Sequence, residues 1–355
     1  MKKEELINRL LFQNKLTEEE FEVLIAEEIN EPSEMLLKAS RKVTDSHYGR
    51  KIYFRGLIEM TNICKNNCYY CGIRRDNKNI HRYHMSESEI LACCAIGYKL
   101  GIRTFVLQGG EDVRDTTPNL SSLVSKIKSI YNECAITLSL GEKSKKDYEL
   151  LKQSGVDRYL LRHETACHDH YSMLHPSEMK LESRMRCLND LKDLGFQVGA
   201  GFMVGTIGQS AKTLAKDLYF LQSFKPQMVG IGPFIPQIDT PFANEKQGSL
   251  NATLAMIALT RLVLPKALIP STTALATIDE RGRELGLLAG GNVLMPNLSP
   301  LEIRKDYALY DNKVTVGIDA IEGFNSLLDA LKSNGFEPDL SRGDHLDYAL
   351  HSGSL

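Results

Sequence analysis

The sequence lacks the features that mark nucleic-acid-binding and membrane proteins. Its 43 Lys and Arg residues nearly balance 45 Asp and Glu residues, so the formal net charge is -2 and no basic field favours nucleic acid. No apolar run reaches the roughly 18 residues that suggest a membrane span. Residues 1–20 mix charges into their apolar positions, unlike the core of a signal peptide. We therefore expect a cytoplasmic protein whose partners are neither nucleic acid nor membrane.

The chain also lacks the dinucleotide-binding signature G-x-G-x-x-G after its first predicted strand, which disfavours an open doubly wound sheet. From residue 52 onward, short β-branched or apolar runs alternate with amphipathic segments. This alternation predicts an α/β fold, a complete (β/α)8 TIM-type barrel with its chemistry at the carboxyl ends of the strands. The predicted strands are 53–60, 104–108, 135–140, 158–162, 197–203, 228–232, 268–272 and 292–295. The predicted helices are 86–100, 120–131, 145–154, 182–194, 211–224, 253–264 and 282–289.

No linker or internal repeat divides the chain, so we expect one domain in three parts. Residues 1–50 form a predicted N-terminal helical cap, because apolar residues recur at helical spacing and a capping box begins at Thr17. Residues 51–322 form the predicted barrel. Residues 323–355 are predicted to be a C-terminal helix and a polar tail.

Eight cysteines in a chain without an export signal indicate metal binding or reduced thiols more than disulfides. Three of them, Cys64, Cys68 and Cys71, form the motif C-x3-C-x2-C directly after the first predicted strand. Thiolates bind iron–sulfur clusters and zinc, and a structural site of either kind normally takes four protein ligands. Three thiolates leave one iron of a [4Fe–4S] cluster open to a ligand such as S-adenosylmethionine (SAM). The other cysteines lack such spacing and are expected to be small buried hydrophobes: Cys93, Cys94, Cys134, Cys167 and Cys187.

Two alternatives remain for this motif. It is a zinc knuckle that a distant Cys or His completes, or it is three unrelated buried cysteines. The residue type at position 70 favours the cluster, because Tyr70 stands immediately before Cys71, where radical SAM proteins usually carry an aromatic residue beside the adenine.

Polar residues follow the next three predicted strands, and the barrel would gather them around the cysteine loop. Gly110 and Glu111 belong to a Gly-Gly-Glu segment whose glycines would leave backbone carbonyls near the amino group of a ligand. Carboxylates here would bind ribose hydroxyls, and an arginine would pair with a carboxylate of SAM. The alternative is a set of rim salt bridges, with Glu142 as the partner of Arg162. The residues expected at this mouth are Ser139, Glu142, Arg162, His163 and Glu164.

Read in order, these segments resemble the HydE family of radical SAM [FeFe]-hydrogenase maturases from about residue 57 to residue 310. The resemblance rests on CKNNCYYCGIRRDNKNIHRY, VLQGGED, TLSLGE, DRYLLRHETA, GIGPFIPQIDTPFANE, IPSTTALATI and GGNVLMPNLSP. It implies a [4Fe–4S] cluster, SAM bound to its open iron, and 5′-deoxyadenosyl radical chemistry. Biotin synthase and methylornithine synthase are similar in cluster loop and barrel, but they are not expected to carry these segments together.

The resemblance also implies which residues bind each ligand. The implied SAM contacts are Tyr70, Gly110, Glu111, Ser139, Glu164 and Arg184. The implied substrate contacts are Arg162, Thr272, Thr273, Met295 and Tyr310. The implied substrate is a small anionic, cysteine-ligated iron complex made by the partner maturase HydG and used to build the diiron subcluster of the hydrogenase. HydF and an electron donor such as ferredoxin or flavodoxin are the further implied partners.

One departure from the family pattern bears on this interpretation. Some members carry C-terminal cysteines that bind a second cluster, but residues 311–328 contain no Cys, which excludes a second cluster there. This leaves open a paralogue with another small-molecule substrate. The alternatives are a methylornithine-synthase-like amino-acid mutase and a non-enzymatic iron–sulfur scaffold or carrier.

Overall fold

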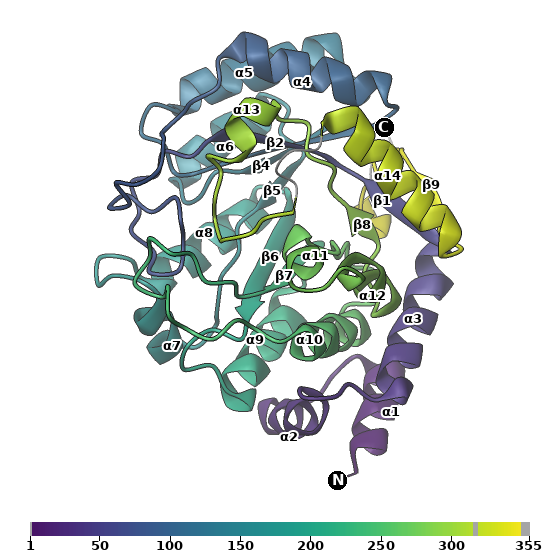
Figure 1. The fold of residues 1–355 in the computed structure, drawn as a ribbon. Helices are drawn as coiled ribbons and strands as arrows, with labels where there is room; N and C mark the ends of the chain where they lie inside the picture. The colour runs from purple at the N-terminus through teal and green to yellow at the C-terminus, as the bar shows by residue number, and fades with distance from the viewer. Residues whose placement is uncertain (1, 315–318, 349–355) are drawn as a thin grey trace.

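The computed structural model describes residues 2–314 and 319–348. The predicted capping box is present, because the Thr17 hydroxyl accepts from Glu20 N and the Glu20 carboxylate accepts from Thr17 N. The helices that open the chain pack against α9 (Ala211–Phe224) and α10 (Leu250–Val263) at one end of the molecule (Figure 1). As predicted, helices dominate the first fifty residues: α1 (Lys3–Gln13), α2 (Glu18–Glu28) and α3 (Glu34–Tyr48).

Six parallel strands form the main sheet, and their order in space is their order in the chain. Helices connect successive strands, as expected for parallel neighbours. Three strands, the first and the last two, are buried at every residue, as expected of a parallel sheet whose two faces are covered. In order, the strands are β2 (Gly56–Thr61), β3 (Thr104–Gly109), β4 (Ala135–Ser139), β5 (Arg158–Leu160), β6 (Gln197–Val204) and β7 (Met228–Pro233).

A second parallel sheet has the order β8-β1-β9. The predicted strand 53–60 is therefore wrong as one element, because β1 pairs with β8 and β9 while β2 pairs with β3. The tail is also more regular than predicted, since β9 pairs in parallel with β1. The three strands are β1 (Lys51–Phe54), β8 (Val293–Leu294) and β9 (Glu337–Asp339).

The predicted strand 268–272 is absent. In its place, Leu268 and Pro270 form isolated parallel bridges, to Met228 and Val293 respectively. Pro270 has no N–H to donate, so the backbone bonds here, which include Ser271 N to Val293 O at 3.0 Å, do not form a continuous ladder. The structure therefore shows an α/β fold with parallel sheets, and the ladders of its described residues do not form one continuous ring of eight strands.

The helices that connect successive strands cover the sheet (Figure 1). Three of them end at glycines in the left-handed region, Gly101 (φ +86°), Gly155 (φ +102°) and Gly195 (φ +72°). No described helix is long and apolar enough to cross a membrane. The further predicted helices are α4 (Glu87–Lys99), α5 (Thr117–Ile130), α6 (Lys145–Gln153), α8 (Leu181–Asp193), α12 (Gly282–Leu288) and α14 (Ala320–Ser333). Short helices that were not predicted are α7 (His168–Leu174), α11 (Thr273–Ile278) and α13 (Leu301–Arg304).

The amino-terminal end of the main sheet is closed by a charged network. Arg158 at the start of β5 is fully buried, and its guanidinium donates to Asp344 Oδ1 at 2.6 Å and to Arg342 O at 2.7 Å. Arg342 in turn donates to Asp344 Oδ2 at 2.8 Å. Gln197 of β6 also donates to Asp344, at 2.7 Å. The C-terminal segment thus fills this end, and the opposite end is left for chemistry.

Candidate functional site

The loop that carries the three cysteines follows β2 and is held by hydrogen bonds to its own carbonyls. Cys71 N donates to Cys68 O at 3.3 Å. Arg82 spans the loop, because a planar guanidinium offers five donors in a fixed geometry. It donates at 2.6–3.0 Å to the carbonyl oxygens of Asn62, Ile73, Arg74 and Asn77. Sequence reasoning missed Arg82, and no spacing signal distinguishes it from its basic neighbours.

The three cysteines of this loop are free thiols. Burial raises the pKa of the Cys71 thiol to about 12. Burial also raises the pKa of Cys64 and of Cys68. Without a metal the thiols are therefore protonated at neutral pH, and a bound cation is needed to make them thiolates.

The distances between the thiol sulfur atoms help to distinguish a zinc site from an iron–sulfur cluster. Among described residues, one set of three or more Cys, His, Asp or Glu places its ligand atoms within 4.8 Å of one another, and it contains no Cys: His84, Asp112 and Asp115. At least one pair of the three Sγ atoms is thus farther apart than the roughly 3.8 Å that tetrahedral Zn–S bonds of about 2.3 Å require. A four-iron cluster spreads its thiolates over separate irons. The donor set therefore fits a cluster better than a single zinc ion. The remaining cysteines are buried, as predicted.

The Gly-Gly-Glu segment after β3 packs tightly on the cysteine loop. A Cβ atom on Gly110 would lie 2.3 Å from Ile63 O, so only glycine permits this approach. Glu111 N lies 3.4 Å from Cys64 Sγ. The Glu111 carboxylate is paired with Lys65 Nζ at 3.1 Å, and the carbonyls of Gly110 and Glu111 already accept hydrogen bonds. A ligand here would use the second lone pair of such a carbonyl.

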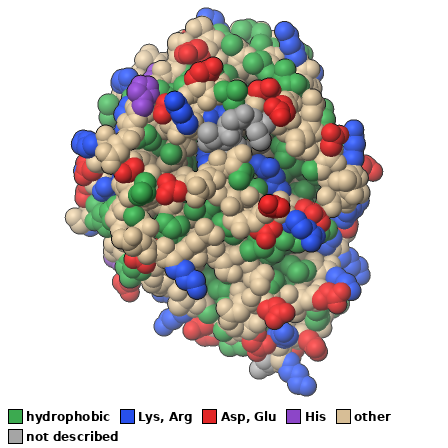
Figure 2. Space-filling model, viewed as in Figure 1, with side chains coloured by type: hydrophobic (Ala, Val, Ile, Leu, Met, Phe, Trp, Pro, Cys, Tyr) green, Lys and Arg blue, Asp and Glu red, His purple; other side chains and the backbone are tan. Residues whose placement is uncertain are grey.

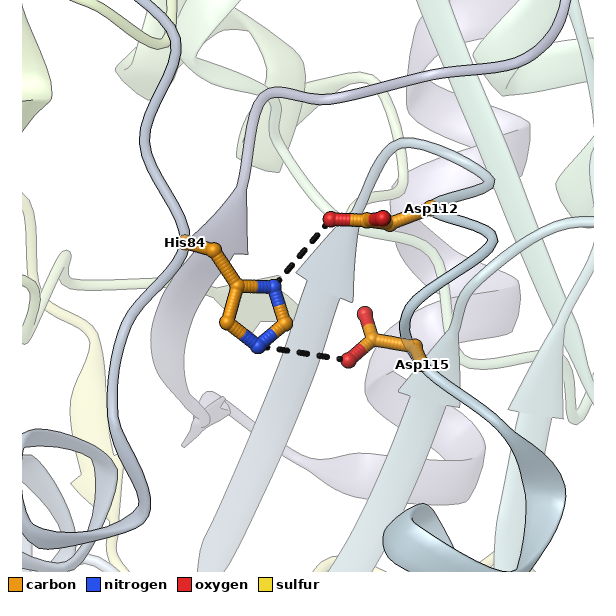
Figure 3. A group of neighbouring side chains, drawn as sticks. All are labelled: His84, Asp112 and Asp115. Carbon is orange, nitrogen blue, oxygen red and sulfur yellow. Dashed lines mark hydrogen bonds and ion pairs between the residues drawn. The ribbon is translucent and has the colours of Figure 1, made fainter.

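Beyond Glu111, the same loop carries two aspartates that face one imidazole (Figure 3). His84 Nδ1 lies 3.1 Å from Asp112 Oδ2, and its Nε2 lies 3.6 Å from Asp115 Oδ1. Burial alone would raise the pKa of Asp112, but hydrogen bonds from Arg114, Thr61 and His84 lower it to about 2. With Asp112 so fully engaged, this set stabilises the loop that holds Glu111.

Arg184 of α8 lies at the mouth with Glu142. Its Nε donates to Glu142 Oε1 at 2.6 Å, and its Nη1 donates to Arg162 O at 2.6 Å. Ser183 Oγ donates to the other oxygen of Glu142, also at 2.6 Å. The alternative in which Glu142 pairs with Arg162 is therefore wrong, because Arg184 occupies that carboxylate.

Arg162 and Glu164 face one another after β5. Arg162 Nη2 lies 3.1 Å from Glu164 Oε2, yet neither atom makes a hydrogen bond in the described structure. Arg162 Nε is buried and also lacks one. Glu164 has φ +66°, a left-handed conformation that costs a non-glycine residue energy. The pair is under-satisfied and strained, which is typical of a site that a polar ligand completes.

Thr272 and Arg162 both lie next to one face of β7. Gly230 and Gly232 are two residues apart on β7, so they share one face. A Cβ on Gly230 would lie 3.8 Å from Arg162 Cδ, and one on Gly232 would lie 3.2 Å from Thr272 Oγ1. That hydroxyl is buried without a hydrogen-bond partner. The glycines of β7 thus let Arg162 and Thr272 approach the same face of the strand.

Comparison with known proteins identifies the family. The sequence profile of the Radical SAM superfamily matches residues 58–221. The [FeFe] hydrogenase maturase subunit HydE of Thermotoga maritima is 46% identical over 284 residues, which are 80% of this chain and 81% of that protein. The chain belongs to the HydE family of radical SAM enzymes. The 3-methylornithine synthase of Methanosarcina acetivorans is more distant, at 28% identity over 91% of this chain and 90% of that protein.

Solved structures show the same fold. Methylornithine synthase (PylB) matches with a TM-score of 0.81 at 24% identity, covering 94% of this chain and 97% of that chain. The maturase HydG from Carboxydothermus hydrogenoformans matches with a TM-score of 0.78 at 22% identity, covering 95% and 79%. Enzymes of the radical SAM superfamily use a [4Fe–4S] cluster and SAM. The three thiols of one loop, and the nearby buried polar atoms that lack hydrogen bonds, fit both in this HydE-family chain.

The remaining expected SAM residues lie around the same mouth. The Tyr70 hydroxyl lies 3.2 Å from His175 Nε2. His175 Nδ1 lies 3.0 Å from Tyr171 O and donates to it, so Nε2 is the acceptor for Tyr70. Burial lowers the pKa of His175 to about 3, which keeps the ring neutral. Sequence reasoning missed His175, because 105 residues separate it from Tyr70. Ser139 is the last residue of β4 and is half-buried.

The remaining expected substrate residues come from the last units of the fold. Thr273 begins α11, and Met295 follows β8. Burial raises the pKa of Tyr310, whose hydroxyl also interacts with Thr277 of α11. The structure thus brings Arg162 and Thr272 to one strand face, while Met295 and Tyr310 lie on the side of α11 and α12.

A buried ion pair that the sequence did not reveal lines the interior near β2. Glu59 is 1% exposed and pairs with Lys313 Nζ. Asn297 Nδ2 donates to the other oxygen of this carboxylate at 2.9 Å. The pair satisfies both charges, so Glu59 anchors the segment that follows Tyr310 and is not a free carboxylate.

Proposed function

We propose that this radical SAM enzyme is a hydrogenase maturase that acts on a small anionic, cysteine-ligated iron complex during assembly of the diiron subcluster of [FeFe]-hydrogenase. The identity to the maturase subunit HydE over four-fifths of both chains supports this function. One observation carries it in this chain: beside one face of β7, Arg162 and Glu164 form an ion pair whose facing atoms make no hydrogen bond, and the Thr272 hydroxyl is buried without a hydrogen-bond partner. When bound, the cluster supplies the electron that cleaves SAM and yields the 5′-deoxyadenosyl radical.

The residues of this chain would divide between the two ligands. Cys64, Cys68 and Cys71 would hold the cluster, and Arg82 would keep their loop in shape. For SAM we propose Tyr70, Gly110, Glu111, Ser139, Glu164 and Arg184. For the substrate we propose Arg162, Thr272, Thr273, Met295 and Tyr310. A guanidinium binds a carboxylate through two parallel hydrogen bonds, so Arg162 suits an anionic group.

We also propose that the strands act as a complete (β/α)8 barrel. Isolated parallel bridges join Met228 to Leu268, Pro270 to Val293, and Leu57 to Asn297. These bridges lie where a seventh and an eighth strand would complete the circuit back to β2. Enclosure by the barrel would protect a radical from solvent and stray hydrogen atoms.

HydG, HydF and a reductant such as ferredoxin or flavodoxin are the proposed partners, in the cytoplasm. Acidic and basic side chains are interspersed on the face shown in Figure 2, which suits no extended nucleic-acid contact.

The deciding experiment reconstitutes the full chain anaerobically with iron and sulfide and adds SAM and dithionite. We expect 5′-deoxyadenosine, together with maturation of apo-hydrogenase when HydG and HydF are present. Formation of 3-methylornithine instead would favour the mutase. Absence of 5′-deoxyadenosine from a cluster-loaded protein would favour the scaffold.

A further inference from the structure

A cavity of about 310 Å³ opens beside the proposed substrate residues. It lies between α12, the segment that follows β8, and the start of α14, which are neighbours along one side of the molecule (Figure 1). Its volume is at the lower end of the range for small-molecule sites, about 300–1,000 Å³. Met295 borders the cavity, so it adjoins the region assigned to the substrate.

Two of the charged residues that line this cavity are already engaged. Arg304 donates to Ser299 O at 2.8 Å and to Asn297 O at 2.9 Å. Asp319 caps α14 by accepting from Ile321 N and Glu322 N. Neither side chain is therefore available as the main contact for a ligand. Glu280 is exposed at the edge.

Arg283 of α12 is different. Its guanidinium makes no hydrogen bond or ion pair with any described residue, although it is only partly exposed. Burial lowers its pKa, and the one ionisable neighbour that opposes this is the Tyr310 hydroxyl. The residues outside the described ranges, 1, 315–318 and 349–355, include no Asp or Glu. No carboxylate side chain of this protein therefore offsets the Arg283 charge.

An uncompensated, partly buried cation is costly, and a bound anion removes that cost. We propose that Arg283 binds the carboxylate of a small organic anion in this cavity. The guanidinium favours a carboxylate because the two groups match in a bidentate pair. Met295 and Leu327 supply apolar contact for the rest of the molecule.

This assignment deepens the proposed function and rests on it in one respect: the carboxylate belongs to the substrate. Arg283 lies near Tyr310, and Met295 is shared between the cavity and the proposed substrate set. Arg283 would therefore hold one end of the substrate while Arg162 and Thr272 contact the other.

The test soaks crystals of the full, cluster-reconstituted chain in sodium iodide, with and without excess acetate. We expect an anomalous peak at the Arg283 guanidinium that acetate displaces, that Arg283→Gln removes, and that Arg283→Lys retains. Arg281→Gln is the matched control, because Arg281 is exposed and pairs with Glu284. No peak, or a peak that survives Arg283→Gln in a protein of unchanged melting temperature, would overturn the assignment.

A kinetic measurement separates this inference from the proposed function. In Arg283→Gln, 5′-deoxyadenosine formation without substrate should be unchanged, while the KM for substrate should rise about tenfold or more, as expected for a lost hydrogen bond to a charged group. An unchanged KM would show that the carboxylate is not that of the substrate. If the wild-type chain cleaves no SAM, the proposed function fails, whereas the iodide result still decides whether Arg283 binds an anion.

Discussion

Arg158 begins β5, Arg162 follows the end of that strand, and the two arginines have different surroundings. Arg158 is bound by Asp344 and by Arg342 O from the C-terminal segment. Arg162 faces a strained Glu164 and has nitrogen atoms without hydrogen bonds. Arg158 closes one end of the protein, and we propose that Arg162 binds a ligand. The two differ in burial, since Arg158 is fully buried and the Arg162 side chain is 32% exposed. They also differ in their partners, since both terminal nitrogens of Arg158 donate hydrogen bonds whereas Nη2 of Arg162 has only an ion pair.

The largest expected effect concerns the cysteine loop near Arg162. Replacing Cys64, Cys68 or Cys71 with Ala should remove the cluster and all SAM cleavage, because no described side chain could replace the lost thiolate. Iron and sulfide analysis and 5′-deoxyadenosine formation measure this. Cys93→Ala is the control, because Cys93 is buried on α4 away from the loop. A Cys68→Ala protein with a SAM-perturbed [4Fe–4S] signal would show that the ligand assignment is wrong.

Arg158 and Arg162 should differ in how much each contributes to the free energy of unfolding. Arg158→Ala removes a fully buried guanidinium that donates to Thr104, Arg342 O and Asp344. Asp344 keeps its bonds from Arg342 and Gln197, so we expect a loss of about 2–3 kcal/mol in the free energy of unfolding. Arg162→Ala removes a partly exposed side chain whose ion pair with Glu164 carries no hydrogen bond, so we expect a smaller loss of about 1 kcal/mol. Urea denaturation of the reconstituted proteins compares them. Equal destabilisation by both changes would show that the two arginines contribute equally to stability.

Within the candidate site, the next comparison is between the roles of Arg162 and Glu164. Arg162→Ala should retain SAM cleavage without substrate but lose hydrogenase maturation, whereas Glu164→Ala should weaken SAM binding itself. The two side chains lie 3.1 Å apart, so each change also alters the environment of the other. SAM affinity and maturation, measured for both variants, separate the roles. An equal loss of SAM affinity would mean that the two residues act as one unit.

The sequence predicted the parts of the site that depend on local spacing. The cysteine loop, the capping box at Thr17 and most helices are of this kind. It failed at the strand 268–272, where apolar composition outweighed the missing N–H of Pro270. It also missed β9, because Glu337 and Pro338 are poor strand formers that an edge position tolerates. Arg82, His175 and Lys313 were missed because their partners are set by the tertiary fold and leave no periodic trace in the chain.

The smallest expected effect concerns the loop that supports Glu111. Asp112 has a pKa lowered to about 2 by Arg114, Thr61 and His84, against about 3.9 in an unfolded chain. Because the folded value is the lower one, the ionised carboxylate stabilises the protein above about pH 4, and that contribution is lost as the pH falls towards 2. Arg114 is half-exposed and its charge is screened, so we expect only about 1 kcal/mol from Asp112→Asn at neutral pH. Urea denaturation of wild type and variant between pH 6 and pH 3 measures this. The two stabilities should converge on acidification, and 5′-deoxyadenosine formation should persist. A difference that stayed constant with pH would show that the ionised Asp112 is not what stabilises the loop.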